Sequence, residues 1–395
     1  MKYDFNRVHD RTNNFSAKYD ELGQKFGREE LIPLWVADMD FQAAEPIVEA
    51  LRQRVEQGIY GYTSRSDSYF QAVCEWLERR HGWRAKRELM IHSPGVVPSL
   101  SLIIEHFTMP GDKIIIQPPV YYPFFDVVKS HERTLVENPL KVVNGRYEMD
   151  YEQLEELGKA GAKLLLLCSP HNPVGRVWTK EELVRLGEIC LTYGILIISD
   201  EIHSDLVFSG HKHVPMAMIS EEFRRNTITC IAPSKTFNLA GLQASIVIFP
   251  NGDDRRKFDK VLGAIDMRRN NCFSLVATEA AYRYGDGWLE EVLEYIEGNF
   301  TFIRDFCREH IPEVVPNFPE GTYLVWLDCR GMQLDRDELH DFMLDKAKIA
   351  MDDGFWFSND YDGYMRLNAA CPRSIIAKAL QQWKDAWESC RERSG

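Results

Sequence analysis

Lys235 stands in a sequence context in which an amine could carry out covalent chemistry. It belongs to the stretch Ala232-Pro233-Ser234-Lys235-Thr236, which follows the β-branched residues 227–231. Its neighbours are small, apolar or hydroxyl-bearing, whereas most lysines are flanked by other charged residues. An amine held in such a pocket can form a Schiff base with a carbonyl cofactor. A lysine that merely extends from the end of a strand into water would have the same local sequence, so its partners must decide.

A possible anion site begins at Gly95. The sequence Ser93-Pro94-Gly95-Val96-Val97 makes a turn and then enters an apolar helix. The first amides of a helix have no partner within the helix, and the helix dipole adds positive potential there. An ordinary helix start after a Pro-Gly turn is the alternative for this stretch.

Two further polar side chains follow buried strands. Asn172 comes after the apolar residues 164–168, and Asp200 comes after residues 195–199. In a parallel α/β sheet, ligands bind at the carboxyl ends of the strands. We therefore expect Asn172, Asp200 and Lys235 to converge on one ligand, together with the helix start at Gly95.

These four groups match the chemical needs of pyridoxal phosphate. A lysine holds the aldehyde of this cofactor as an imine, and a buried carboxylate keeps its pyridine nitrogen protonated, so that the ring can accept electrons. A hydrogen-bond donor polarises the ring hydroxyl, and a helix N-terminus binds the phosphate. The sequence therefore predicts pyridoxal 5'-phosphate as the cofactor.

The same motifs, in the same order, resemble those of fold-type I pyridoxal-phosphate enzymes of the aminotransferase class I/II superfamily. Within it, the chain is similar to cystathionine β-lyases (C–S β-lyases) of the MalY/PatB type. The stretches that carry this closer resemblance are Val36–Phe41, Asp200–His203, Ser234–Leu242 and Arg366–Arg373.

The resemblance implies a role for each matching residue. Lys235 would form the Schiff base and move the substrate's α-proton, Asp200 would pair with the pyridine nitrogen, and Tyr121 would stack on the ring. Arg366 would bind the substrate α-carboxylate with two parallel hydrogen bonds, assisted by Asn172 and the backbone of Ala37. The remaining cofactor contacts would come from Asn172 at the ring hydroxyl, from Gly95, Val96, Val97 and Ser234 at the phosphate, and from Tyr62 of a second subunit.

Three positions depart from the aminotransferase pattern. Gln243 stands eight residues after Lys235, where aminotransferases usually carry a phosphate-binding arginine. His203 stands three residues after Asp200, where a tyrosine is usual; it would either supply the second hydrogen bond to the ring hydroxyl or only pack nearby. Ala232 also replaces a common hydroxyl-bearing residue. Gln243 and His203 favour the lyase branch over an aminotransferase.

Short apolar strands alternating with helices position these residues. The pattern is typical of an α/β domain with a mainly parallel sheet, and the resemblance implies seven strands flanked by helices. After about residue 285 the pattern changes to a long helix, a strand pair near 322–327 and 364–367, and further helices at 336–347 and 374–391. We predict a large domain at residues 46–284 and a smaller α+β domain made of residues 1–45 and 285–395. Within the smaller domain, residues 1–30 are expected to form an irregular arm.

The composition narrows the function classes. The net charge of −13 argues against nucleic acid or an anionic membrane as a partner. No apolar run approaches the roughly 20 residues that span a bilayer, and no secretory signal is recognisable. The nine cysteines are scattered without metal-ligand spacing, which indicates reduced thiols and a cytoplasmic protein, and we expect no metal site.

Three functions follow from these observations. The first is β-elimination from S-substituted L-cysteines, with release of a thiol (homocysteine from cystathionine), pyruvate and ammonia. The second is a class I/II aminotransferase, which shares the first half of the reaction. The third is a cofactor-binding regulatory protein that acts through a protein partner. A homodimer is expected, because the Tyr62 loop would complete the site of the second subunit.

Overall fold

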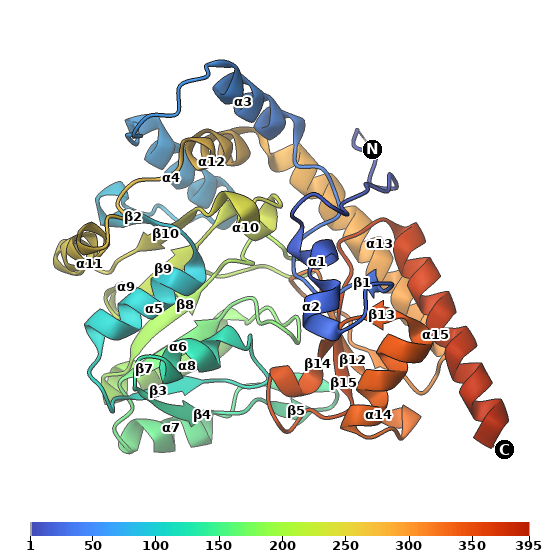
Figure 1. The fold of residues 1–395 in the computed structure, drawn as a ribbon. Coiled ribbons are helices and arrows are strands. Elements are labelled where there is room, and N and C mark those ends of the chain that lie inside the picture. Colours follow the sequence, from blue (N-terminus) through green and yellow to red (C-terminus); the bar gives the residue numbers. More distant parts are fainter. Residues whose placement is uncertain (1, 395) are drawn as a thin grey trace. The chain divides into compact units, whose positions relative to one another are not determined.

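The computed structural model describes residues 2–394, which form two compact units (Figure 1). The first unit comprises the residues up to Gln42, the segment Asn172–Gly175 and the residues from Glu290 onward. The second comprises Ala43–His171 and Arg176–Leu289. The functional domain boundaries inferred above, at residues 46 and 284, stay a prediction.

A seven-stranded sheet forms the centre of the second unit, in the order β2-β10-β9-β8-β7-β3-β4. Only β10 runs antiparallel to its neighbours, so the mainly parallel α/β sheet is confirmed. In sheet order the strands are β2 (Met90–Ser93), β10 (Ser245–Ile248), β9 (Thr227–Ile231), β8 (Leu196–Asp200), β7 (Leu164–Cys168), β3 (Lys113–Ile116) and β4 (Thr134–Glu137).

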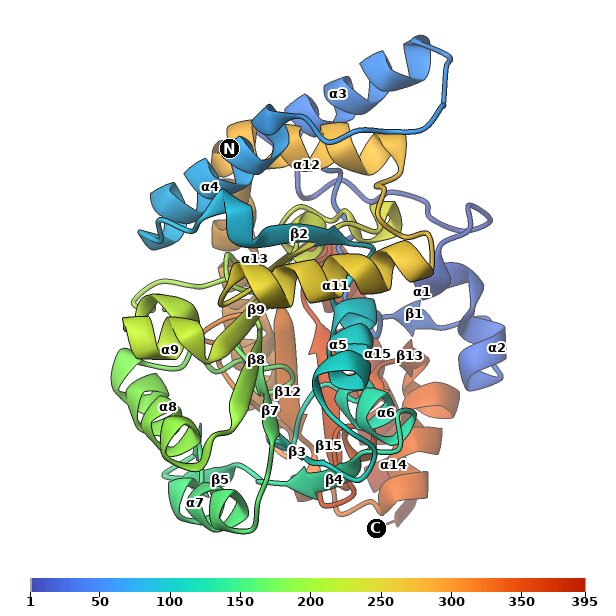
Figure 2. The ribbon, with the colours of Figure 1, turned by 90° about the vertical axis from the view of Figure 1, so that its left-hand side faces the viewer.

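Helices cover both faces of this sheet, which explains why its strands are continuous apolar runs rather than alternating ones. Figure 2 shows three helices on one side, namely α5 (Val96–Phe107), α6 (Pro123–Lys129) and α11 (Gly252–Ala264). On the other side lie α7 (Tyr151–Lys159), α8 (Lys180–Tyr193) and α9 (Glu221–Arg225). A capping box starts α8: Thr179 Oγ1 accepts from the Glu182 amide (3.2 Å), and Glu182 Oε2 accepts from the Thr179 amide (2.8 Å).

Two further helices of the second unit, α3 (Glu45–Glu56) and α4 (Asp67–His81), each pack against α12 (Cys272–Tyr284). The loop between α3 and α4 carries Tyr62. The remaining helix, α10 (Pro233–Thr236), is a single turn that directly follows β9 and carries Lys235.

The first unit is built on a four-stranded antiparallel sheet in the order β11-β12-β15-β14. Its strands are β11 (Val315–Pro316), β12 (Leu324–Asp328), β15 (Tyr364–Asn368) and β14 (Asp352–Asp353). The predicted strand pair near residues 322–327 and 364–367 is therefore confirmed. Arg366, in the middle of β15, lies opposite Trp326 on one neighbouring strand and opposite Asp352 on the other.

The N-terminal residues are less irregular than expected, because two short helices form there. These are α1 (Ala17–Asp20) and α2 (Leu22–Phe26). Leu22 and Phe26 pack in a small core with Leu31, Trp35 and Leu344, so burial rather than local propensity orders the segment. Strand β1 (Ile32–Pro33) then pairs in parallel with β13 (Ile349–Ala350).

The helices after residue 285, most of whose residues belong to the first unit, largely follow the predicted pattern. They are α13 (Asp286–His310), α14 (Arg336–Asp341), which continues as a π-helical turn through Phe342–Ala347, and α15 (Arg373–Ser394). Several elements were not predicted, including β4, α7, α9, α11, α12 and the hairpin of β5 (Lys141–Val143) and β6 (Arg146–Glu148). Among residues 2–394, no helix combines the length and apolar character needed to cross a membrane.

Candidate active site

Lys235 is held in place through its neighbour Thr236. The Thr236 hydroxyl donates a 2.8 Å hydrogen bond to the buried carboxylate of Asp205. Asp205 also contacts His81 Nε2 at 2.8 Å and accepts from Trp76 Nε1 at 3.1 Å. Burial alone would raise the pKa of the Asp205 carboxyl, but these partners hold that pKa below its usual value. An ionised, fully bonded carboxylate therefore anchors the turn that carries Lys235.

Asp200 is the last residue of β8, in register with Cys168 of β7 and Cys230 of β9. Its side chain is buried, and Oδ1 accepts from the Ile202 amide at 3.1 Å. Burial raises the pKa of Asp200 to about 7, although the Ile202 amide and the charge of Lys235 act in the opposite direction. This carboxylate lies within electrostatic reach of Lys235 and needs a cationic partner to be fully ionised at neutral pH.

Glu201, the next residue, has a carboxylate whose hydrogen-bond partners lie within the protein. Its carboxylate accepts from Ser199 Oγ (2.9 Å) and the Met216 amide (3.0 Å), and it contacts His213 Nε2 at 3.0 Å. His213 is buried as well. Of the two neighbouring carboxylates, Asp200 is therefore the one with bonding capacity to offer a ligand.

The start of α5 has the geometry expected of an anion site. Gly95 is its N-cap, and the Gly95 carbonyl accepts from both the amide (3.1 Å) and the hydroxyl (2.7 Å) of Ser99. Val96 and Val97 stand in the first turn of α5. No carbonyl of the helix is therefore placed to accept a hydrogen bond from their amides. A Cβ at position 95 would meet Pro98 Cδ at 3.2 Å, so glycine also keeps this approach clear.

The other residues of the second unit that are predicted to contact the cofactor differ in how deeply they are buried. Tyr121 is partly buried, with its ring centroid 5.4 Å from that of Tyr122 and 6.2 Å from that of Phe124. His203 is buried, and its carbonyl accepts from the Leu206 amide at 2.9 Å. Ser234 precedes Lys235 on α10 and is partly exposed.

Tyr62 lies on a surface loop and is fully exposed in the single chain, at 97%. The Arg269 guanidinium lies 5.8 Å from the centroid of its ring. Thr63 Oγ1 donates to the Asn270 carbonyl at 2.6 Å, which ties the loop to the segment before α12. These residues line a hollow of about 360 Å³. An exposed tyrosine beside an arginine offers a hydroxyl and a positive charge to a ligand.

In the first unit, Arg366 and Asn172 are in direct contact. Arg366 Nη1 donates to Asn172 Oδ1 at 3.0 Å, and Nη2 donates to the Trp35 carbonyl at 3.1 Å. A further bond joins Nη2 to the Asp352 carboxylate, and the guanidinium lies 4.9 Å from the centroid of Phe357. Arg366 is only 2% exposed, so it is not an ordinary surface charge.

The backbone around Ala37 is fixed from the same sheet. Tyr323 Oη donates to the Ala37 carbonyl at 2.7 Å, and Asn368 Nδ2 donates to the carbonyls of Val36 and Asp38, each at 2.6 Å. Three successive carbonyls are thus held by side chains. The first unit therefore brings Arg366 and Asn172 into contact and holds the Ala37 segment rigid.

A buried ion cluster holds the other side of this segment. Lys18 is completely buried, and its Nζ lies 2.8 Å from Asp40 Oδ2 and 3.7 Å from Asp38 Oδ1. Arg11 completes the cluster, with nitrogens 2.6 Å from both Asp38 and Asp40. Neither Arg11 nor Lys18 was expected to matter, because each sits in a polar stretch that reads as a solvated arm.

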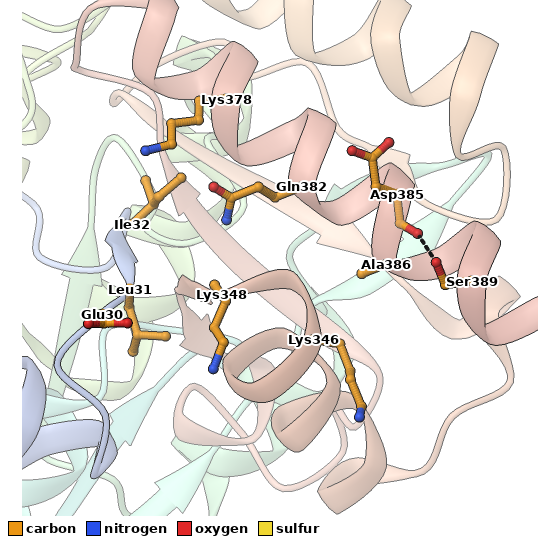
Figure 3. A pocket seen from close by; sticks show the side chains of 10 residues that line it. All are labelled: Glu30, Leu31, Ile32, Lys346, Lys348, Lys378, Gln382, Asp385, Ala386 and Ser389. Atoms are coloured by element: carbon orange, nitrogen blue, oxygen red, sulfur yellow. Dashed lines mark hydrogen bonds between the residues drawn. The ribbon is translucent and has the colours of Figure 1, made fainter.

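A larger hollow of about 670 Å³ lies elsewhere in the first unit, between β1, the turn after α14 and α15 (Figure 3). Three exposed lysines border it, Lys346, Lys348 and Lys378, as the close view shows. The described residues that line it include none of the predicted site residues. Its size alone therefore does not make it the active site.

Comparison with known proteins gives a consistent family. Residues 29–382 match the family described as aminotransferase class I and II. The chain is 43% identical over 383 residues to cystathionine β-lyase PatB of Bacillus subtilis, covering 97% of this chain and 99% of that protein. It is 32% identical over 381 residues to the protein MalY of Escherichia coli, covering 96% and 97% of the two chains.

A solved structure shares both the fold and half of the sequence. A pyridoxal-phosphate-bound protein of Clostridium difficile 630, described as an aminotransferase, has a TM-score of 0.96 and 51% identity, and the match covers 98% of this chain and all of that one. The chain therefore belongs to the aminotransferase class I and II family, and within it to the group that resembles PatB and MalY.

Proposed function

We propose that the protein is a pyridoxal-phosphate-dependent C–S β-lyase that cleaves S-substituted L-cysteines, cystathionine among them. The net reaction breaks the Cβ–S bond and consumes one water, giving a thiol, pyruvate and ammonia. The observation that carries this proposal is the pair of Lys235 and the buried Asp200, within a chain that is similar to cystathionine β-lyase PatB over 97% of its length.

The described residues fit pyridoxal phosphate. The raised pKa of the buried Asp200 indicates a carboxylate that lacks sufficient cationic partners, which a protonated pyridine nitrogen would provide. The amides of Val96 and Val97 at the start of α5, with the Ser234 hydroxyl, would hold the phosphate. Tyr121 would cover the ring face, while Asn172 and His203 would serve its hydroxyl.

The role proposed for each residue follows from the chemistry of its side chain. Pyridoxal phosphate, when bound, supplies a ring that accepts the electron pair left on the substrate's α-carbon. Lys235 would hold the cofactor when substrate is absent and would take the α-proton from the substrate when it is present. Asp200 would keep the ring nitrogen protonated. Asp205, through Thr236, would keep the Lys235 amine in position.

Arg366 would fix the substrate by its α-carboxylate, with Asn172 and the Ala37 amide beside it. The guanidinium is already oriented by Asn172 and the Trp35 carbonyl, so little freedom is lost when a carboxylate binds. Holding the α-proton toward a base is an orientation effect, which can lower a barrier by up to about 7–11 kcal/mol.

The active unit would be a homodimer in the cytoplasm, acting on small amino acids without nucleic acid or membrane as partner. The exposure of Tyr62, at 97%, supports a dimer in which this loop completes the phosphate site of the second subunit. Exposed apolar side chains near this loop, Val55, Ile59 and Tyr60, add to the surface that such a contact would bury.

The test is to supply L-cystathionine to the holoenzyme with no keto acid present. We expect pyruvate, ammonia and homocysteine in equal amounts. Lys235→Ala should abolish all three products, together with the visible absorbance of the lysine-bound cofactor. Absence of products from the unaltered enzyme would contradict the proposal.

An aminotransferase is the second candidate, because the Clostridium difficile protein that shares 51% of the sequence is described as one. Such an enzyme would transfer the substrate's α-proton to the cofactor instead of eliminating a thiol. It would need a keto acid to complete each turnover. Gln243 favours the lyase: it is exposed on a left-handed turn (φ 50°), where aminotransferases usually carry the phosphate-binding arginine.

A further inference from the structure

Arg366 faces a carboxylate before any substrate arrives. Asp352 of β14 lies directly opposite Arg366 of β15, and its Oδ2 accepts from Arg366 Nη2. The side chains are 1% and 3% exposed, respectively. The second oxygen of Asp352, Oδ1, is buried and has no hydrogen-bond partner among the described residues. A proposed carboxylate-binding arginine is thus already paired with a buried acid.

The donors of Arg366 show what an incoming carboxylate must displace. A guanidinium offers two edges that can bind a carboxylate with two parallel bonds: Nε with Nη2, and Nη1 with Nη2. Nη2 belongs to both edges and already donates to Asp352 and the Trp35 carbonyl. Nε has no partner among residues 2–394. A carboxylate can therefore gain a two-donor edge only by replacing an acceptor at Nη2, and of the two only Asp352 is a side chain that can rotate.

The charges in this place do not allow two ionised carboxylates. Burial raises the pKa of Asp352 to about 6, with Arg366 opposing that rise and Asp353 adding to it. Lys25 of α2 also acts electrostatically on Asp352 and opposes the rise, and its ammonium lies 4.1 Å over the ring of Trp356. Asp353 itself is paired with His340 at 2.9 Å. A second carboxylate on the same guanidinium would add repulsion and favour the neutral form of Asp352.

We propose that Asp352 is a counter-ion that the substrate's α-carboxylate displaces from Arg366, and that Asp352 takes up one proton in the exchange. The inference rests on the proposed role of Arg366 as the carboxylate clamp. It makes Asp352 a positioning residue that keeps the empty clamp neutral and oriented. The affinity for amino acids then falls as the pH rises above about 6, by about tenfold per pH unit, because each binding event consumes a proton.

The experiment is an equilibrium titration of the holoenzyme with L-alanine, which has the α-carboxylate but no leaving group. The cofactor absorbance reports binding, and the wild type is compared with Asp352→Asn between about pH 6 and pH 8.5. Titrations of the cofactor and of the ligand amine cancel in the ratio of the two dissociation constants. We expect this ratio, wild type over variant, to increase by about tenfold per pH unit.

Two controls isolate the carboxylate. Ethylamine, which is L-alanine without the carboxylate, should give a ratio that does not change with pH. Asp353→Asn is the matched variant, because Asp353 is the neighbouring buried acid on the opposite face of β14 and bonds His340 instead. It should leave the pH dependence of L-alanine binding as in the wild type.

A measurement on the unaltered enzyme keeps the inference testable if Asp352→Asn does not fold. In weakly buffered solution at about pH 7.5, L-alanine should take up about one proton per site more than ethylamine does. A flat ratio, or equal proton uptake for the two ligands, would overturn the inference. Arg366→Lys tests the role of Arg366 separately from the proton uptake by Asp352. If this variant weakens L-alanine binding but not ethylamine binding, Arg366 binds the α-carboxylate even where the proton coupling fails.

Discussion

Arg366 Nη1 donates a 3.0 Å hydrogen bond to Asn172 Oδ1, which joins two side chains 194 positions apart in the sequence. The bond also sets the orientation of the Asn172 amide, because its oxygen faces the guanidinium and its nitrogen must face elsewhere. A substrate carboxylate and the ring hydroxyl of the cofactor would thus be bound by side chains that are mutually fixed. This relationship makes the clamp sensitive to small changes at Arg366.

Replacing Arg366 by lysine should impair substrate binding, although the substitution keeps the positive charge. A lysine has no planar fork and cannot reproduce the bonds to Asn172 and the Trp35 carbonyl. We expect kcat/KM for S-substituted cysteines to fall roughly ten- to a hundredfold. Steady-state kinetics would measure this, with the absorbance of the bound cofactor unchanged as the control. Equal kcat/KM values would show that Arg366 does not bind the substrate.

The apoprotein should show the raised pKa of Asp200 as a pH-dependent stability. A carboxyl whose pKa is raised in the folded state favours folding below its unfolded pKa, and this contribution is lost as the pH rises toward the folded value of about 7. Asp200→Asn should therefore become more stable than the wild type as the pH rises. The difference should grow by roughly 2–3 kcal/mol between about pH 5 and pH 8.

Urea denaturation of the two apoproteins at several pH values checks this. Adding pyridoxal phosphate should remove most of the difference, since the pyridinium would stabilise the ionised Asp200 but not the amide. A difference that is the same at all pH values would show that Asp200 is not a perturbed acid.

Lys18 should be one of the most stabilising charges of the first unit. Replacing it by methionine leaves Asp40 buried, with the Arg11 ion pair still in place. Removing one member of a buried ion pair typically costs about 3–5 kcal/mol, and we expect a loss near the lower value because Arg11 remains. The double variant Lys18→Met with Asp40→Asn should recover part of it, as denaturant unfolding would show. Full additivity of the two losses would contradict coupling within the cluster.

A shared site can be tested by mixing two inactive proteins. If Tyr62 completes the neighbouring subunit's site, Tyr62→Ala and Lys235→Ala place their defects in different sites of a mixed dimer. Random exchange of subunits in equal amounts then restores about a quarter of the sites. Pyruvate formation measured after joint refolding should rise accordingly, whereas two defects in the same subunit's site would give no recovery.

The sequence predicted those parts of the molecule whose signals are local. The strand at residues 227–231 was located correctly, because burial on both faces leaves a continuous run of β-branched and apolar residues. The pairings of Lys18 with Asp40 and of Arg366 with Asp352 were not predictable, because long-range packing brings them together. Asp205 was missed for the same reason: nothing near it indicates Thr236, 31 positions away.

The C–S lyase assignment is tested most directly by a single competition experiment. The holoenzyme is given L-cystathionine together with an excess of 2-oxoglutarate, and thiol and pyruvate are measured alongside glutamate. We expect homocysteine and pyruvate to form at the same rate with or without the keto acid, with negligible glutamate. Glutamate formation that depends on the keto acid, with no homocysteine released, would contradict this assignment.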